Sequence, residues 1–140
     1  MSSIKHFFST IIVLLIIISI TYLLSFDSIK INNFPIVYIF TIIILILNTL
    51  SFMHSYAFKT DIFFDLIGSI SFISVGVASL ILITDVDANQ ILIFFLLIFW
   101  ALRLGPFLFI RRLSAGPDER LSEYFKSPLS LYFIWTMNSL

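Results

Sequence analysis

The chain has 140 residues, of which 60% are hydrophobic and only 11% are charged, and its formal net charge is zero. Soluble domains carry about 25% charged residues, so this composition, with a mean hydropathy of +1.12, predicts an integral membrane protein in a lipid bilayer. The neutral charge and the lack of a basic tract exclude nucleic acid as a partner, because phosphates select for clustered Lys and Arg. Cysteine is absent and the two histidines are far apart, which argues against a disulfide framework and a metal site.

The first two apolar runs, residues 7–26 and 34–53, are long enough to be membrane helices, which need about 20 residues to cross a hydrocarbon core of roughly 30 Å. The first run could also be a signal peptide. It is longer than the 7 to 15 or so residues of a signal core, and no A-x-A-like cleavage site follows it, so a retained helix is favoured. We expect Pro35 in the first turn of the second helix, where proline is tolerated.

The third run, residues 62–84, differs from the others because small side chains are spread through it. Gly68, Ser71, Gly76 and Ser79 follow helical spacing, and small residues let membrane helices approach closely. This pattern predicts an interior, tightly packed helix. Asp61 lies just before this run, and Asp65 lies one helical turn further on, within its first turn. Both positions are near a helix N-terminus, which favours carboxylates.

The fourth run, residues 91–110, contains one arginine, Arg103. A cation inside a membrane helix costs about 2.5 to 3.5 kcal/mol on insertion scales unless it reaches water or a partner. Three interpretations remain open: an arginine that reaches the headgroups along its own stem, an intramembrane ion pair, and a ligand-binding group. Asp65 lies at a similar predicted depth and is the candidate for the ion pair.

Helical spacing places Trp100 on the same face as Arg103, and Phe107 continues this stripe. Pro106 cannot donate a hydrogen bond to the carbonyl of Leu102, so we expect a kink just after Arg103. Trp100 and Asp65 are therefore candidates for a structural role or for the wall of a substrate cavity.

The last apolar run, residues 128–140, is too short to span the hydrocarbon core, because its helix would rise only about 20 Å. The sequence therefore predicts an all-α, polytopic transmembrane helix bundle with four full spans and a truncated fifth. We interpret residues 1–140 as a single membrane domain that is the N-terminal part of a longer one.

Positive charge flanking the spans predicts the orientation. With a cytoplasmic N-terminus, the cytoplasmic side carries nearly all of the cations beside the spans, and the other side carries only Lys30. The cytoplasmic set is Lys5, Lys59, Arg111, Arg112, Arg120 and Lys126.

The fourth span is followed by a cluster of charge, which includes Arg111, Arg112, Asp118 and Arg120. One interpretation is that Arg111 and Arg112 are ordinary positively charged anchors at the cytoplasmic end of a span. The charges of the loop could likewise form local salt bridges in water. Their gathering beside a kinked helix also suits capture of a phosphate-bearing molecule by guanidinium groups, and both interpretations remain open.

These residues carry a resemblance to a known family. The segments WALRLG (100–105), RR (111–112) and GPDER (116–120), preceded by FDLIGSISF (64–72), resemble the uncharacterised branch of the steroid 5α-reductase-like membrane proteins. The resemblance covers about residues 56–140. The order and spacing of these segments make it more specific than any one of them.

The resemblance implies an NADPH-dependent reductase that transfers hydride to an enone double bond of a lipid or sterol-like substrate. On this hypothesis Arg103, Arg111, Arg112, Asp118 and Arg120 are the candidate cofactor contacts, and no catalytic proton donor is assigned. Later helices of that family hold much of the cofactor and have no counterpart here, so we expect no turnover by this chain unless a partner chain completes the bundle. Alternatives are a methyltransferase of the isoprenylcysteine type and a non-enzymatic membrane subunit.

Overall fold

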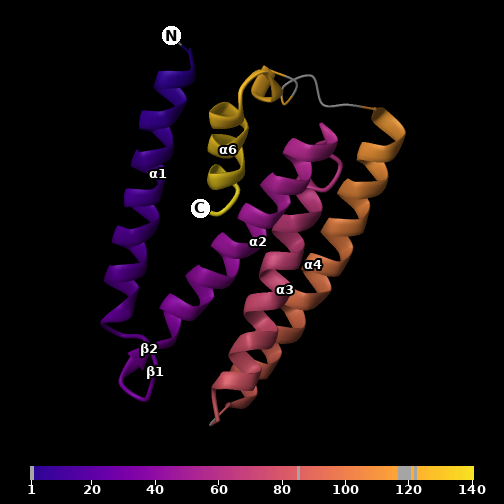
Figure 1. The fold of residues 1–140 in the computed structure, drawn as a ribbon. Coiled ribbons are helices and arrows are strands. Elements are labelled where there is room, and N and C mark those ends of the chain that lie inside the picture. Colours follow the sequence, from indigo (N-terminus) through magenta and orange to yellow (C-terminus); the bar gives the residue numbers. More distant parts are fainter. Residues whose placement is uncertain (1, 85, 117–120, 122) are drawn as a thin grey trace.

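The computed structural model describes residues 2–84, 86–116, 121 and 123–140, and it is an all-α bundle with one small hairpin (Figure 1). The long helices are α1 (Ser2–Ser25), α2 (Ile36–Phe58), α3 (Phe64–Leu82) and α4 (Ala88–Ala115). The shorter elements are the strands β1 (Lys30–Ile31) and β2 (Phe34–Pro35), the 3-10 helix η1 (Glu123–Lys126) and the helix α6 (Pro128–Met137).

Four helices are long and apolar enough to cross a membrane, as the sequence predicts. These are Ile4–Ser25, Ile36–Phe58, Phe64–Leu82 and Ala88–Ala115. The fifth apolar run forms α6, whose 10 residues rise about 15 Å, or half of a hydrocarbon core. Ser127 caps its N-terminus by accepting a hydrogen bond from the backbone N–H of Ser130, and proline occupies the first turn.

The start of the second span was predicted wrongly. Pro35 does not lie in the first turn of α2, because its backbone is extended (φ −61°, ψ 127°) and it pairs with Lys30 across the hairpin. The turn between the strands consists of Asn32 and Asn33, both left-handed with φ of 49° and 65°. Asparagine tolerates this conformation, which two-residue hairpin turns require. The hairpin thus joins α1 to α2 with a tight connection.

The fourth span is longer than its predicted bounds of 91–110 at both ends. Asp87 begins α4 with a capping box, accepting a hydrogen bond from the N–H of Gln90 (2.7 Å) while its own N–H donates to the Gln90 side chain (3.1 Å). The helix continues through Pro106 and includes Arg111 and Arg112 before it ends at Ala115. Both arginines are therefore held on a helix rather than in a loop.

The helices are arranged as two pairs with α6 wedged into one of them (Figure 1). α1 and α2 meet at the hairpin and diverge toward the other end, where α6 packs between them. Trp135 and Leu131 of α6 are 2% and 3% exposed and form part of the buried core. Tyr124 and Phe133 contact the ring of His6 on α1, with centroids 5.7 and 5.4 Å away.

Polar side chains tie the apolar helices together. Asn138, just after α6, donates to the side-chain oxygen of Asn48 on α2 (3.0 Å) and, at 3.4 Å, to the carbonyl of Phe64 on α3. Thr21 and Thr41 share a hydrogen bond of 3.0 Å between α1 and α2. Such bonds satisfy polar groups that lipid cannot, so they fix which helix faces meet.

α3 and α4 pack closely through their small residues. A Cβ added at Gly105 would come within 2.8 Å of the Ser69 Cβ, and one at Gly76 would come within 3.3 Å of the Phe94 ring. Ser69, Ser71 and Gly76 are all buried in the bundle. The predicted role of the small residues of the third span in close helix packing is confirmed.

Candidate functional site

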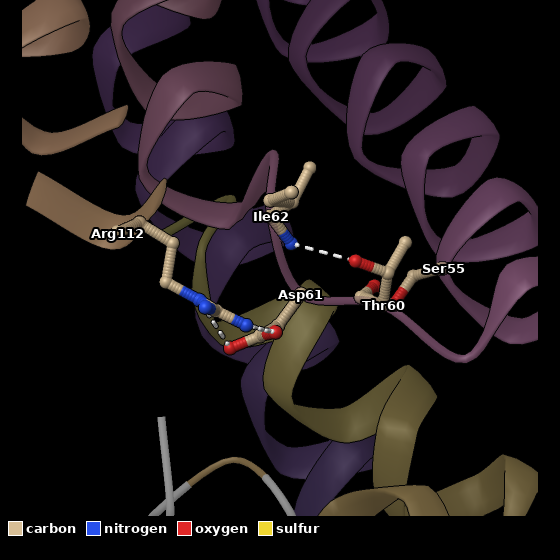
Figure 2. A network of polar contacts seen from close by, with 5 residues as sticks. All are labelled: Ser55, Thr60, Asp61, Ile62 and Arg112. Carbon is tan, nitrogen blue, oxygen red and sulfur yellow. Dashed lines mark hydrogen bonds and ion pairs between the residues drawn. The ribbon is translucent and has the colours of Figure 1, made fainter. Parts of the chain in front are cut away.

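A largely buried ion pair joins the loop before α3 to the end of α4 (Figure 2). The Nε of Arg112 donates to one carboxylate oxygen of Asp61 at 3.1 Å, and its Nη2 donates to the other, which makes the contact bidentate. The two side chains are only 16% and 9% exposed. Bidentate guanidinium pairs of this kind fix geometry as well as charge.

The short loop between α2 and α3 holds Asp61 in place. Lys59 ends α2 in a left-handed conformation with φ of 51°. Ser55 then donates to the carbonyl of Thr60 at 2.6 Å, and the Thr60 hydroxyl accepts from the N–H of Ile62 at 3.3 Å, as Figure 2 shows. The backbone around Asp61 is thus fixed on both sides, which orients the carboxylate toward α4.

A cavity of about 320 Å³ lies beside this ion pair, at the end of the bundle that also carries the N-terminus. Its charged walls come from α4, from the start of α3 and from the loop before α3, and its other walls come from α3, α6 and the segment that precedes α6. The lining residues are Asp61, Phe64, Asp65, Arg111, Arg112, Leu121, Tyr124 and Ile134.

The two arginines of this cavity differ in whether they form an ion pair. Arg112 is committed to Asp61, whereas Arg111 is exposed and makes no ion pair within the described part of the chain. Nearby, the Lys126 ammonium donates to Glu123 at 2.6 Å on the surface of η1, and this hydrogen bond lowers the pKa of the Glu123 carboxyl. Considering only the described residues, the cavity therefore combines a fixed ion pair with a second guanidinium, that of Arg111, which is in no ion pair.

The structure brings some of the predicted site residues together and separates others. Asp65, Arg111 and Arg112 line the same cavity. Arg103 and Trp100 do not reach it; they line a separate hollow of about 250 Å³ along α4, together with Leu104 and Phe107. Asp118 and Arg120 fall outside the described residues.

The proposed pair between Asp65 and Arg103 does not form. Among residues 2–84, 86–116, 121 and 123–140 no ion pair joins these two side chains, and Arg112 is instead paired with Asp61. The reason is helix rotation: Gly105 and Ala101 face the bundle, so Arg103 between them points away from it.

Two polar residues of the cavity lining were missed by sequence reasoning. Asp61 was interpreted only as a helix N-terminal carboxylate, although it lies two positions after Lys59 and so at the same membrane edge as Arg112. Matching depths at that edge would have suggested the pair. Tyr124 carried no signal, because its position depends on how the segment before α6 folds back over the helix ends.

The fold and its charged cavity define a class: a polytopic α-helical membrane protein with an ionic site at one end of the bundle. Comparison with protein families is more specific. The chain matches the family described as "Protein of unknown function (DUF1295)" over residues 51–140, and it belongs to that family. The match includes α3, α4 and α6 and therefore every residue of the cavity. No curated protein and no solved structure matches the chain.

Proposed function

We propose that this chain provides the cofactor mouth of a membrane-embedded, NADPH-dependent reductase acting on the enone double bond of a lipid or sterol-like substrate. The observation that carries the proposal is the cavity that places Arg111 beside the Asp61–Arg112 pair at the end of an apolar bundle. The motifs that resemble the steroid 5α-reductase-like proteins lie in the same region, between Phe64 and Arg120.

The residues of the cavity fit the phosphate-bearing part of a dinucleotide. Ligand pockets span about 300 to 1,000 Å³, so a cavity of about 320 Å³ would take one portion of such a molecule rather than all of it. Arg111 makes no ion pair with any residue that the structure describes, so its guanidinium is the candidate to bind phosphate oxygens. Asp61 holds Arg112 in one orientation, so that the second guanidinium is positioned before a ligand arrives.

The chemistry then divides between cofactor and protein. NADPH supplies the hydride. The protein's described residues would bind and orient phosphates at Arg111 and Arg112, while Phe64, Leu121 and Ile134 exclude water from the inner wall of the cavity. An apolar substrate would reach the reaction from the lipid, through the span-forming helices that surround the site.

Binding by the purified protein in lipid nanodiscs tests the proposal. NADPH, NADH and S-adenosylmethionine should be titrated separately by calorimetry, and we expect NADPH to bind with a salt-sensitive affinity. Arg111→Gln should weaken it roughly tenfold, the effect of losing one charge-assisted hydrogen bond of about 1.5 kcal/mol. Lys59→Gln is the matched control, because it removes one positive charge at the same end but lies outside the cavity.

Three results would contradict the proposal. These are binding of S-adenosylmethionine in place of NADPH, binding of neither nucleotide, and equal losses for the Arg111→Gln and Lys59→Gln variants. The first of these results would favour a methyltransferase, and the second a non-enzymatic membrane subunit. Oxidation of NADPH on addition of a sterol or fatty enone then tests the reductase step itself.

A further inference from the structure

Arg103 lies on the outer face of α4, away from the rest of the bundle. α4 packs on α3 through Ala101 and Gly105, which are buried. The side chains that flank Arg103 on the outer face are large and open to the surroundings, with Trp100 46% and Phe107 60% exposed. Together with Leu104 these residues line the hollow of about 250 Å³, which we call the Arg103 groove.

The Arg103 groove lies within the membrane-spanning part of α4. Arg103 is about eight residues from Arg111, which corresponds to about 12 Å along the helix axis. Over the described ranges the Arg103 side chain has no hydrogen bond and no ion pair. A guanidinium facing hydrocarbon without a partner costs about 2.5 to 3.5 kcal/mol on insertion scales, so a partner that neutralises it would stabilise this face.

We propose that the Arg103 groove is a docking surface for a transmembrane helix that carries a carboxylate at the depth of Arg103. Charge complementarity selects the chemistry, because a carboxylate is the group that guanidinium binds in a bidentate fashion. The shape agrees, since a hollow between Trp100 and Phe107 can receive one side chain of a neighbouring helix. α4 is also the least covered of the four spans, with 11% of its apolar window buried against 17% to 22% for the others.

Two other occupants fit the groove less well. A lipid phosphate sits at headgroup level, near Arg111, about 12 Å along the helix from Arg103, so the Arg103 side chain would have to leave the groove and extend toward the headgroups to meet it. A second copy of this chain would have to offer its own intramembrane carboxylate, but Asp65 faces the cavity shared with Arg111 and Arg112. A separate acidic helix meets neither obstacle. This inference does not depend on the proposed function, because it involves neither the cavity nor a cofactor.

Energy transfer in vesicles tests the docking surface. The labelled protein is reconstituted in phosphatidylcholine vesicles at pH 8 without nucleotide, together with a synthetic leucine–alanine transmembrane helix. Three versions of the synthetic helix are compared. The first carries one Glu at the depth of Arg103, the second carries Gln at that position, and the third carries the Glu about 15 Å along its axis from that depth. We expect the matched Glu helix to associate at least tenfold more tightly than the other two.

Variants of the protein make the test specific. Arg103→Leu should abolish the preference for Glu over Gln, while Lys59→Leu, which removes a charge away from α4, should keep it. Circular dichroism checks that both variants retain their helices. Equal binding of the Glu and Gln helices, or a preference that survives Arg103→Leu, would overturn the proposal. So would loss of the preference when phosphatidylglycerol is added, because an anionic lipid would then be the occupant.

Discussion

The Asp61–Arg112 pair shows why burial, rather than the mere presence of two charges, decides the importance of a contact. Ion pairs on a surface contribute little, because water solvates and salt screens both charges. Here both side chains are largely withdrawn from solvent. Removing one partner therefore leaves the other in a medium that solvates charge poorly.

A double-mutant cycle measures this dependence. Arg112→Leu and Asp61→Leu should each lower the free energy of unfolding, and the double variant should lose at least about 1 kcal/mol less than the sum of the two single losses, because the two side chains interact directly. Unfolding in mixed micelles, followed by circular dichroism, gives the four stabilities. The equivalent cycle for Asp65 and Arg103 is the control and should be additive, because the two side chains are not paired.

The Asn48–Asn138 hydrogen bond gives a second prediction at single residues. Asn48 is only 2% exposed, so the Asn138→Leu substitution should remove the donor that the side-chain oxygen of Asn48 has in this apolar environment. We expect a loss of about 1 kcal/mol, typical of polar contacts between membrane helices. Asn89→Leu, at an exposed position near the start of α4, should cost much less. Equal losses for the two variants would show that the bond contributes nothing specific.

The sequence identifies which residues are chemically unusual but not how they are paired. Arg103, Asp65 and the two arginines of α4 stand out because charge is rare in apolar spans. Their partners depend on how each helix is rotated about its axis, and a rotation of one residue, about 100°, moves a side chain to another face. That rotation is set by contacts such as Gly105 on Ser69, which no local pattern reports.

At the scale of elements, the apolar runs predict the helices well and their ends poorly. Burial in lipid requires long unbroken helices, so the four spans follow from hydropathy alone. Their bounds depend on turn chemistry instead. The Asn32–Asn33 turn converts Phe34 and Pro35 into a strand, and the capping box at Asp87 starts α4 before its apolar run.

The contact between α3 and α4 makes the third prediction. Gly105→Ala places a methyl group within 2.9 Å of both the Cβ and the Oγ of Ser69, so the helices must separate. We expect a destabilisation of about 1 to 3 kcal/mol, as for other overpacked sites. Adding Ser69→Gly should restore most of the stability, because it removes both atoms that clash. Failure of this rescue in thermal unfolding would mean that the two helices are not packed as described.

For the whole molecule, the arrangement of the helices places the N-terminus, the loop before α3 and the end of α4 at the same end of the bundle (Figure 1). Among the residues that the structure describes, the cations beside the spans at that end are Lys5, Lys59, Arg111, Arg112 and Lys126, whereas Lys30 lies at the other end. Two spans separate the N-terminus from the loop before α3, and two more separate that loop from the end of α4, so all three points lie on the same side of the membrane. The position of α6 between α1 and α2 could not be predicted, because it joins segments distant in the sequence.

Orientation in the membrane is the fourth prediction. The charge bias predicts that the N-terminal end is cytoplasmic, so Asn89 should lie on the outer or lumenal side. The chain has no cysteine, so Asn89→Cys and Ala115→Cys each provide a single reactive thiol at opposite ends of α4. A membrane-impermeant maleimide should label the first in sealed cells or vesicles and the second only after permeabilisation. The reverse pattern would refute the predicted orientation.

The wedge position of α6 also has a consequence for the order of events during synthesis. Asn48 and Asn138 form their hydrogen bond although they are 90 positions apart in the chain. The contact between the rings of His6 and Phe133 likewise joins residues that are distant in the sequence. Contacts between such distant segments form last, because the intervening chain must first be made and its ends brought together. While α3 and α4 are still being translated, α1 and α2 therefore lack the contacts with α6 that hold them apart in the folded bundle.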